Sequence, residues 1–330
     1  MPHTSGNHLP SPAPVLEVDG LEVTFPTEAG AVKAADKVSF ALATGTTLGL
    51  VGESGCGKTV TALSLLGLVP PPGRTTSGRV RFGGEDLLEM PERRLEDIRG
   101  KAISMIFQEP MSALNPVFPI GAQIAEGLLI HTSMDKAEAR EAALAMLERV
   151  GIADAAARAN DYPHQLSGGM RQRAMIAIAL ICRPSVLIAD EPTTALDVTI
   201  QAQILDLMVE MQREMGLAIL FISHNLAVVS EVADEIMVMY AGKVVERAPA
   251  EALFAAPLHP YTRGLIETIP GEPRDRLPAI PGMVPSLSAL AAGCRFAERC
   301  PLAEEKCRAD EPELTPSGGD RWAACWLADG

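Results

Sequence analysis

Residues 52–59 carry the pattern in this chain that is most directly tied to chemistry. They read Gly-Glu-Ser-Gly-Cys-Gly-Lys-Thr, the complete G-x-x-x-x-G-K-[ST] pattern of a phosphate-binding loop, between a strand-like run at 47–51 and a helix-like run. In such a loop backbone N–H groups face a phosphate, the lysine reaches the β- and γ-phosphates, and the last hydroxyl ligates Mg²⁺. We therefore expect a nucleotide to contact the whole loop: Gly52, Glu53, Ser54, Gly55, Cys56, Gly57, Lys58 and Thr59.

Four further side chains with catalytic capability stand directly after apolar, strand-like runs: Gln108, Asp190, Glu191 and His224. The run before Asp190, at 185–189, is apolar throughout, which is typical of a parallel strand covered on both faces. Ligands of open α/β sheets bind at the carboxyl ends of the strands, so we expect these four side chains to meet the phosphate loop at one sheet edge. Carboxylates placed there can organise Mg²⁺ and activate a water molecule.

A second loop of the same kind stands at residues 166–173, which read Leu-Ser-Gly-Gly-Met-Arg-Gln-Arg and open a run with helical spacing. The glycines here lie at a helix N-terminus, which is again a site for an anion. The chain therefore carries two phosphate-binding loops that are far apart in sequence.

Four of the six cysteines crowd into the C-terminal segment, after a Pro-rich stretch that begins near residue 257: Cys294, Cys300, Cys307 and Cys325. In a reducing compartment such a group indicates a metal centre more than disulfides. The spacing lacks the C-x-x-C pair that is typical of a zinc ribbon.

The overall composition restricts the class of protein. With 330 residues and 47% hydrophobic residues, the chain can fill a large core and a small second domain. A formal net charge of −14 argues against broad nucleic-acid binding. We see no run apolar enough to span a membrane and no signal peptide at the start, so we expect a cytoplasmic protein.

These motifs need a set of strands and helices to position them. Short alternating runs at 16–18, 21–25, 38–42 and 78–82 predict strands at a sheet edge, and buried strands are expected at 103–107, 185–189 and 217–222. Helical spacing at 135–150 and 168–181 indicates an insertion between two of the buried strands. We expect four segments: 1–14 disordered, 15–255 as the nucleotide-binding domain, about 109–182 within it as the helical insertion, and 256–330 as a separate Pro/Cys-rich appendage.

The ordered set of motifs resembles the ATP-binding subunit of an ABC transporter, from about residue 15 to 245. The resemblance implies an α/β fold of the P-loop NTPase type: a RecA-like parallel sheet, an antiparallel β subdomain at its edge and an inserted α-helical subdomain. It also implies ATP and Mg²⁺ as ligands, and a head-to-tail dimer in which the second loop of one subunit, at Ser167, Gly168 and Gly169, closes over the ATP of the other.

The same resemblance implies a role for each polar residue. Glu191 would be the general base, and Asp190 would organise Mg²⁺ together with Thr59. Gln108 would sense Mg²⁺ and the attacking water, and His224 would touch the γ-phosphate. Two further positions carry roles of the family: Asp197, in the loop that couples the two sites, and Phe25, which either stacks on adenine or belongs to the core.

Three stretches resemble the branch that serves peptide and nickel importers: 108–116, 167–173 (with Met170 in place of the usual Gln) and His259-Pro-Tyr-Thr262. They imply an ATPase that energises the import of di- or oligopeptides at the cytoplasmic face of the cell membrane. The implied partners are a second ATPase (a paralogue or a second copy), two permease subunits contacted near 108–116, and an extracytoplasmic binding protein. The alternatives are a nickel or other small-solute importer and a soluble ATPase acting on ribosomes or DNA.

The importer subunits of this branch can carry a [4Fe–4S] cluster in the C-terminal segment, held by four thiolates. The resemblance thus implies such a cluster on Cys294, Cys300, Cys307 and Cys325. Structural Zn²⁺ and unligated reduced thiols are the two alternatives.

Overall fold

The computed structural model describes residues 14–28, 30–269 and 280–328. The segment expected to be disordered therefore lies outside the described residues, except for Pro14, which begins the first strand. No helix in the described part of the chain is long and apolar enough to cross a membrane.

A four-stranded antiparallel sheet holds the N-terminal strands, in the order β2-β1-β4-β5. The strands are β1 (Pro14–Thr27), β2 (Gly30–Ala43), β4 (Arg74–Phe82) and β5 (Glu85–Asp86). The two short strands expected at 16–18 and 21–25 are one strand, because the residues between them, including Gly20 at φ +57°, form a bulge rather than a turn. One face of this sheet is buried, at Leu16, Val18, Leu21 and Val23.

The central sheet has eight strands, in the order β11-β12-β10-β9-β3-β8-β7-β6. Its parallel part comprises β3 (Thr47–Val51), β6 (Ile103–Ile106), β7 (Val186–Asp190), β8 (Ala218–Ser223) and β9 (Glu235–Tyr240). Every residue of β3, β7 and β8 is buried, because helices or the other sheet cover both faces. The carboxyl ends of these parallel strands lie at one edge.

The C-terminal segment extends this central sheet. Strand β10 (Lys243–Pro249) runs antiparallel to β9, β12 (Trp322–Ala323) pairs with β10, and β11 (Thr315–Pro316) pairs with β12. Two residues of the tail, Trp322 and Ala323, thereby lie opposite Arg247 and Glu246. The tail is thus joined to the nucleotide-binding part by backbone pairing.

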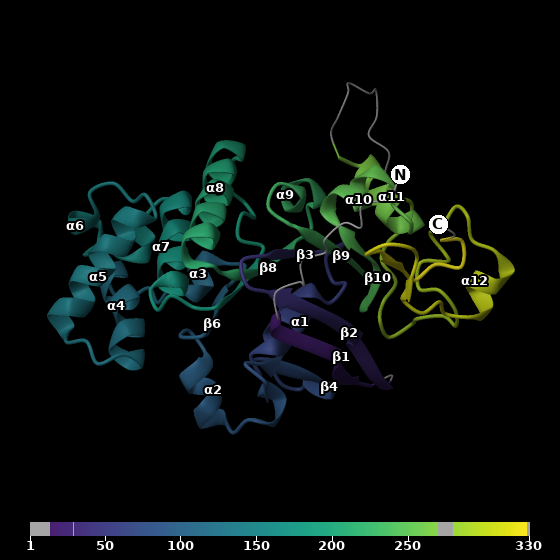
Figure 1. The fold of residues 1–330 in the computed structure, drawn as a ribbon, viewed down its shortest axis with the longest axis horizontal. Helices are drawn as coiled ribbons and strands as arrows, with labels where there is room; N and C mark the ends of the chain where they lie inside the picture. Colours follow the sequence, from purple (N-terminus) through teal and green to yellow (C-terminus); the bar gives the residue numbers. More distant parts are fainter. Residues whose placement is uncertain (1–13, 29, 270–279, 329–330) are drawn as a thin grey trace, which may run out of the picture.

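The helices lie on both sides of the central sheet and at one end of the molecule. They are α1 (Lys58–Leu65), α2 (Glu92–Ile98), α3 (Pro110–Ala113), α4 (Ile120–His131), α5 (Lys136–Arg149), α6 (Ala155–Arg158), α7 (Gly168–Leu180), α8 (Val198–Met215), α9 (Leu226–Ser230), α10 (Ala250–Ala255), α11 (Pro260–Glu267) and α12 (Glu305–Ala309). Helices α4 to α7 gather at one end and the segment around α12 lies at the opposite end, with β1, β2 and β4 along one side (Figure 1).

The inserted helices are set by local signals. Helix α5 matches the helical spacing at 135–150, and Asp135 caps it in a reciprocal capping box with Glu138. Helix α7 begins at Gly168, where Ser167 is the N-cap residue.

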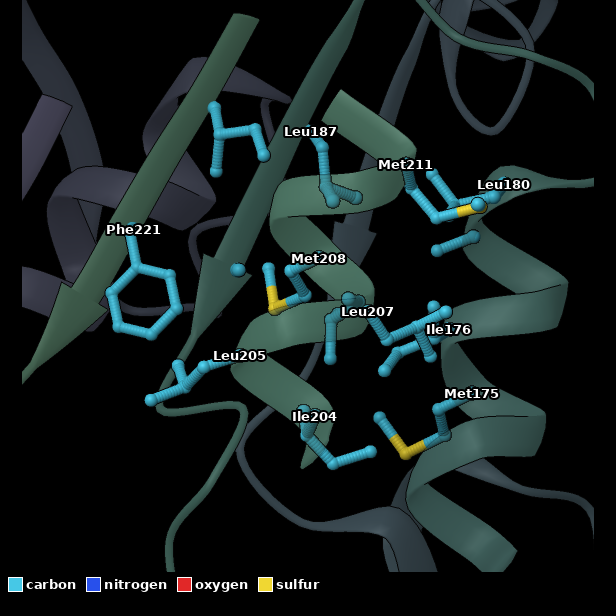
Figure 2. Packing of buried hydrophobic residues seen from close by; sticks show 14 of the residues in the cluster. Met175, Ile176, Leu180, Leu187, Ile204, Leu205, Leu207, Met208, Met211 and Phe221 are labelled. Atoms are coloured by element: carbon cyan, nitrogen blue, oxygen red, sulfur yellow. The ribbon is translucent and has the colours of Figure 1, made fainter. Parts of the chain in front are cut away.

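Helix α8 packs between α7 and the sheet (Figure 2). Met175 and Ile176 of α7 face Ile204 of α8, while Leu187 and Phe221 lie on the neighbouring strands, and all are buried. Burial of one such side chain contributes about 1.5–3 kcal/mol. This packing fixes the first turns of α7 and α8 relative to the carboxyl end of β7.

Candidate nucleotide-binding and hydrolysis site

The phosphate loop connects the end of β3 to the start of α1 and leaves room only for glycine at two positions. A Cβ on Gly52 would lie 2.1 Å from the Met239 carbonyl oxygen, and one on Gly57 would lie 2.0 Å from the Ala34 carbonyl oxygen. Gly57 also has φ +105°, a conformation that residues with a Cβ rarely adopt. The loop therefore packs directly against the backbone at Met239 and Ala34.

Lys58 is buried, and its ammonium group is held at the loop by backbone oxygens. Nζ donates to the carbonyl oxygen of Gly52 at 2.7 Å and to that of Glu53 at 3.1 Å. The side chain of Cys56, in the middle of the loop, is fully buried, and burial raises the pKa of its thiol. The loop therefore combines a positive charge with backbone donors, which suits the phosphates of a nucleotide.

Three side chains converge on one oxygen of the Glu191 carboxylate. Gln108 Nε2 lies 3.1 Å from Oε2, the Thr194 hydroxyl donates to it at 2.8 Å, and His224 Nδ1 lies 3.1 Å from it. Among the described residues none donates a hydrogen bond to Oε1 of Glu191. The structure thus brings together Gln108, Glu191 and His224, as the strand-end argument predicted.

The surroundings keep the Glu191 carboxylate ionised. Burial raises its pKa, but the hydrogen bonds from Thr194 and His224 outweigh burial, so that the net effect lowers the pKa. Glu191 also has φ +49° at the end of β7, which aims the side chain across the sheet edge. An ionised carboxylate held by three donors can orient a water molecule and accept its proton.

Asp190 and Thr59 fit a divalent cation. Asp190 is fully buried, and its Oδ1 atom has no hydrogen-bond partner among the described residues. Burial raises its pKa to about 6, and the neighbouring Thr59 hydroxyl opposes that shift. A buried carboxylate oxygen without a partner, beside a hydroxyl, is the oxygen donor set that Mg²⁺ takes next to phosphates.

The second loop does not join the phosphate loop within this chain. Ser167 accepts a hydrogen bond from the N–H of Met170, and Ser167 and Gly168 are exposed, whereas Gly169 is half-buried. The neighbours of these glycines come from the segment that contains Leu196 and Asp197, and Asp197 caps α8. The structure therefore places the second loop beside the Asp197 loop.

Phe25 lies near the end of β1 and is partly buried. A Cβ on Gly73 would lie 2.4 Å from the Phe25 ring, so the ring packs closely on that backbone and beside Val69. This packing accounts for one part of the ring surface, and stacking on adenine stays a prediction.

Sequence reasoning missed three residues of the site. Thr194 could have been found from the Pro-Thr-Thr run after Glu191. Tyr261 lies in the His259-Pro-Tyr-Thr262 stretch, which was used only to identify a branch, and its hydroxyl accepts the backbone N–H of Glu53 at 3.0 Å. Arg299 of the C-terminal segment pairs with the Glu53 carboxylate, and no local sequence signal indicates this contact.

The four C-terminal cysteines are neighbours. Burial raises the pKa of Cys294 to about 11, and the charges of the other three thiols contribute to the increase. The backbone N–H of Leu327 donates to the sulfur of Cys325 at 3.4 Å. In the ranges that the structure describes, no three His, Cys, Asp or Glu side chains are arranged to hold a metal ion.

Two protein families match the chain. The family described as "ABC transporter" matches residues 35–194, and the family described as "Oligopeptide/dipeptide transporter, C-terminal region" matches residues 245–307. The first match contains the phosphate loop, the second loop and Glu191, and the second contains Tyr261, Arg299 and three of the four cysteines.

Individual proteins are similar over nearly the whole chain. The probable peptide ABC transporter ATP-binding protein y4tR of Sinorhizobium fredii is 52% identical, over 96% of this chain and 95% of its own length. The dipeptide transport ATP-binding protein DppD of Escherichia coli is 46% identical, over 94% and 96%. Among solved structures, the dimeric, post-hydrolysis ATP-binding cassette MJ0796 bound to ADP and Pi is 26% identical with a TM-score of 0.64, over 71% of this chain and 98% of that one.

Proposed function

The chain belongs to the ATP-binding proteins of ABC transporters, in the branch with the oligopeptide/dipeptide C-terminal region, and we propose that it hydrolyses ATP to energise the import of di- or oligopeptides. The observation that carries the catalytic part is the convergence of Gln108, Thr194 and His224 on Glu191, at the sheet edge where the phosphate loop begins. The peptide cargo is supported by the similarity to y4tR and DppD.

In the proposed reaction the chain supplies binding, orientation and a base. The loop N–H groups and Lys58 hold the phosphates, Gln108 and His224 fix the Glu191 carboxylate, and Glu191 accepts the proton of the attacking water. Asp190 and Thr59 would hold Mg²⁺, which when bound neutralises charge on the phosphates. These residue roles are the ones that the resemblance implies, and the geometry described above supports them.

A second ATPase subunit is needed to complete each site in this proposal. In the loop at Ser167, Gly168 and Gly169 the first two residues are exposed, and the side chains nearest to the two glycines are Leu196 and Ile200. In a head-to-tail dimer this loop would face the γ-phosphate held by the partner. The dimeric cassette MJ0796 supports such an assembly, in which the partner is a paralogue or a second copy of this chain.

We propose that two permease subunits contact the surface just after Gln108. Large apolar side chains are exposed there: Phe107, Met111, Val117 and Phe118, the last two at 69% and 53%. This surface is next in sequence to the residue that binds Glu191, so movement of a permease helix against it can reach the base. The proposed location is the cytoplasmic face of the membrane, with a substrate-binding protein on the other side.

Co-purification tests the transporter assignment. A tagged chain is expressed in its native host, the membranes are solubilised gently, and the bound proteins are identified by mass spectrometry. We expect two permease subunits, an ATPase partner and a peptide-binding protein. Recovery of a nickel- or sugar-binding protein would overturn the peptide cargo, and recovery of ribosomal or DNA-repair proteins without a permease would overturn the transport role.

For the C-terminal segment we propose a [4Fe–4S] cluster held by Cys294, Cys300, Cys307 and Cys325. Four neighbouring thiols, of which Cys325 accepts a hydrogen bond from the backbone N–H of Leu327, support thiolate ligands. A four-iron cluster takes one thiolate on each iron, which matches the number of cysteines in this segment.

Metal analysis distinguishes the alternatives for this segment. Protein purified without oxygen should contain iron and absorb broadly in the visible range, and Cys300→Ser should lose both signals. Zinc in place of iron would establish the single-ion site, and neither metal would leave four reduced thiols. We also propose that the chain is divided into a nucleotide-binding domain at 15–255 and a C-terminal domain at 256–330. The helical part, at about 109–182, lies within the first of these domains.

A further inference from the structure

Arg299 belongs to the cysteine-containing tail, yet its guanidinium group contacts the phosphate loop. Nη1 lies 2.6 Å from Glu53 Oε2 and Nη2 lies 3.0 Å from Oε1, so the two side chains form a bidentate salt bridge. The Arg299 side chain is only 5% exposed. The second residue of the nucleotide-binding loop is thus paired with a residue 246 positions further along the chain.

The guanidinium group is itself fixed before it meets the loop. Nε donates to the Pro281 carbonyl oxygen at 2.8 Å and Nη1 donates to the Tyr240 hydroxyl at 3.3 Å. The group also lies over the Tyr240 ring, 5.7 Å from its centroid. Since its orientation is already determined, little conformational freedom is lost when Arg299 binds the carboxylate.

Glu53 is held at two further points. Its backbone N–H donates to the hydroxyl of Tyr261, which is fully buried, and its carbonyl oxygen accepts from Lys58 Nζ at 3.1 Å. The Tyr261 ring packs edge-on against Tyr240 with centroids 4.7 Å apart. One residue of the loop therefore links the tail to the lysine that faces the phosphates.

Arg295 supports the other end of the same loop. Its Nη1 atom donates to the Ala241 carbonyl oxygen at 2.6 Å, and the N–H of the next residue, Gly242, donates to the Cys56 carbonyl oxygen at 2.9 Å. Arg295 also pairs with Asp36 and with Glu311. Two arginines, each next to a cysteine of the tail, thus hold the loop from two sides.

We propose that Arg299 is a positioning residue of the nucleotide site, through which the C-terminal segment sets the shape of the phosphate loop. This inference rests on the assignment of residues 52–59 as the nucleotide site. Without Arg299, the Glu53 carboxylate loses its ion-pair partner beside a site for phosphates, and the loop loses its contact with the tail. ATP should then bind more weakly, while the groups around Glu191 stay in place.

The test compares Arg299→Gln with a matched ion pair elsewhere. Arg247 of β10 forms a similar bidentate salt bridge with Glu235 of β9, in which Nε lies 2.7 Å from Oε1 and Nη2 lies 2.8 Å from Oε2. We expect Arg299→Gln to raise the Kd for Mg-ATP about tenfold, which corresponds to about 1.4 kcal/mol, with kcat at saturating ATP within about twofold. Arg247→Gln should change Kd by less than about twofold although it breaks an equally close pair.

Three further variants separate positioning from a general structural role. Arg299→Lys keeps the positive charge but cannot bind both carboxylate oxygens of Glu53 at once, so it should give an intermediate Kd. It also replaces Arg299→Gln in the test if that variant does not fold. Glu53→Gln combined with Arg299→Gln should bind ATP no more weakly than Arg299→Gln alone, because both act through one pair. An unchanged Kd in Arg299→Gln, or independent additive effects, would overturn the proposal. Normal ATP binding by Lys58→Ala would instead show that the nucleotide site itself is wrongly assigned.

Discussion

Replacement of Glu191 by Gln is the sharpest test of the catalytic geometry. The change keeps the size and the backbone of the residue but removes the charge that Gln108, Thr194 and His224 surround at 2.8–3.1 Å. Loss of a positioned general base lowers turnover by about 100- to 10,000-fold. ATP binding should stay within about threefold of the original protein, because the phosphate loop and Lys58 make no hydrogen bond to Glu191.

The effect on folding should be much smaller than the effect on turnover. Hydrogen bonds to an ionised group contribute about 1.5–3 kcal/mol each, but the amide oxygen keeps part of them and the cost of burying the charge is removed. We therefore expect the free energy of unfolding to change by less than about 3 kcal/mol. Glu210→Gln is the matched control, because Glu210 is 62% exposed and pairs with Arg149 at the surface.

The assay measures phosphate release at saturating Mg-ATP, ATP affinity and thermal unfolding on the same samples, at pH 5 to 8. Since the pKa of Glu191 lies below its ordinary value of 4.5, the base stays ionised over this whole range, and turnover should not fall through loss of this charge. Hydrolysis within about threefold of the original protein in Glu191→Gln would refute the base assignment. If Glu191→Gln instead lost ATP binding while turnover per bound ATP stayed unchanged, Glu191 would act in binding and not as the base. That result would refute the division of the site into a binding part, the phosphate loop with Lys58, and a catalytic part around Glu191.

Three other changes test the neighbouring features. Asp190→Asn should stabilise the nucleotide- and Mg²⁺-free protein by roughly 2–3 kcal/mol at pH 8, because a carboxyl whose pKa rises from 3.8 to about 6 on folding destabilises the folded state when it is ionised. The gain in the free energy of unfolding should shrink as the pH falls from 6 to 4, and unfolding curves measured across this range test it. Gly57→Ala should cost at least about 2 kcal/mol of stability and most ATP binding, since its Cβ meets a backbone oxygen at 2.0 Å, whereas Gly55→Ala, also at positive φ but with open space, should cost less. Phe118→Ser should leave ATP hydrolysis by the isolated chain unchanged and reduce co-purification of the permease, with exposed Met283→Ser as control; equal recovery of permease by both variants would contradict the docking surface.

Much of the fold could be predicted because its signals are local. The apolar runs became β6, β7 and β8, and helical spacing at 135–150 and 168–181 became α5 and α7, within one or two residues of the expected bounds. The convergence of Gln108 and His224 on Glu191 was also predictable, since side chains that follow parallel strands share one sheet edge. The bulge that joins the two halves of β1 could not be predicted, because an Asp-Gly pair such as Asp19-Gly20 is compatible with either a turn or a bulge.

The sequence by itself determined the chemistry of the site: a glycine-rich loop, a lysine and a hydroxyl at its end, and carboxylates after a buried strand. These properties depend on residue types a few positions apart. The tertiary structure alone decided what supports that loop. Tyr261 of α11 and Arg299 of the tail reach Glu53 from segments more than 200 residues further along the chain, and the tail is joined to the central sheet where β12 pairs with β10. A two-residue strand has no periodicity to read, and an ion pair between distant residues is set by the packing of everything between them.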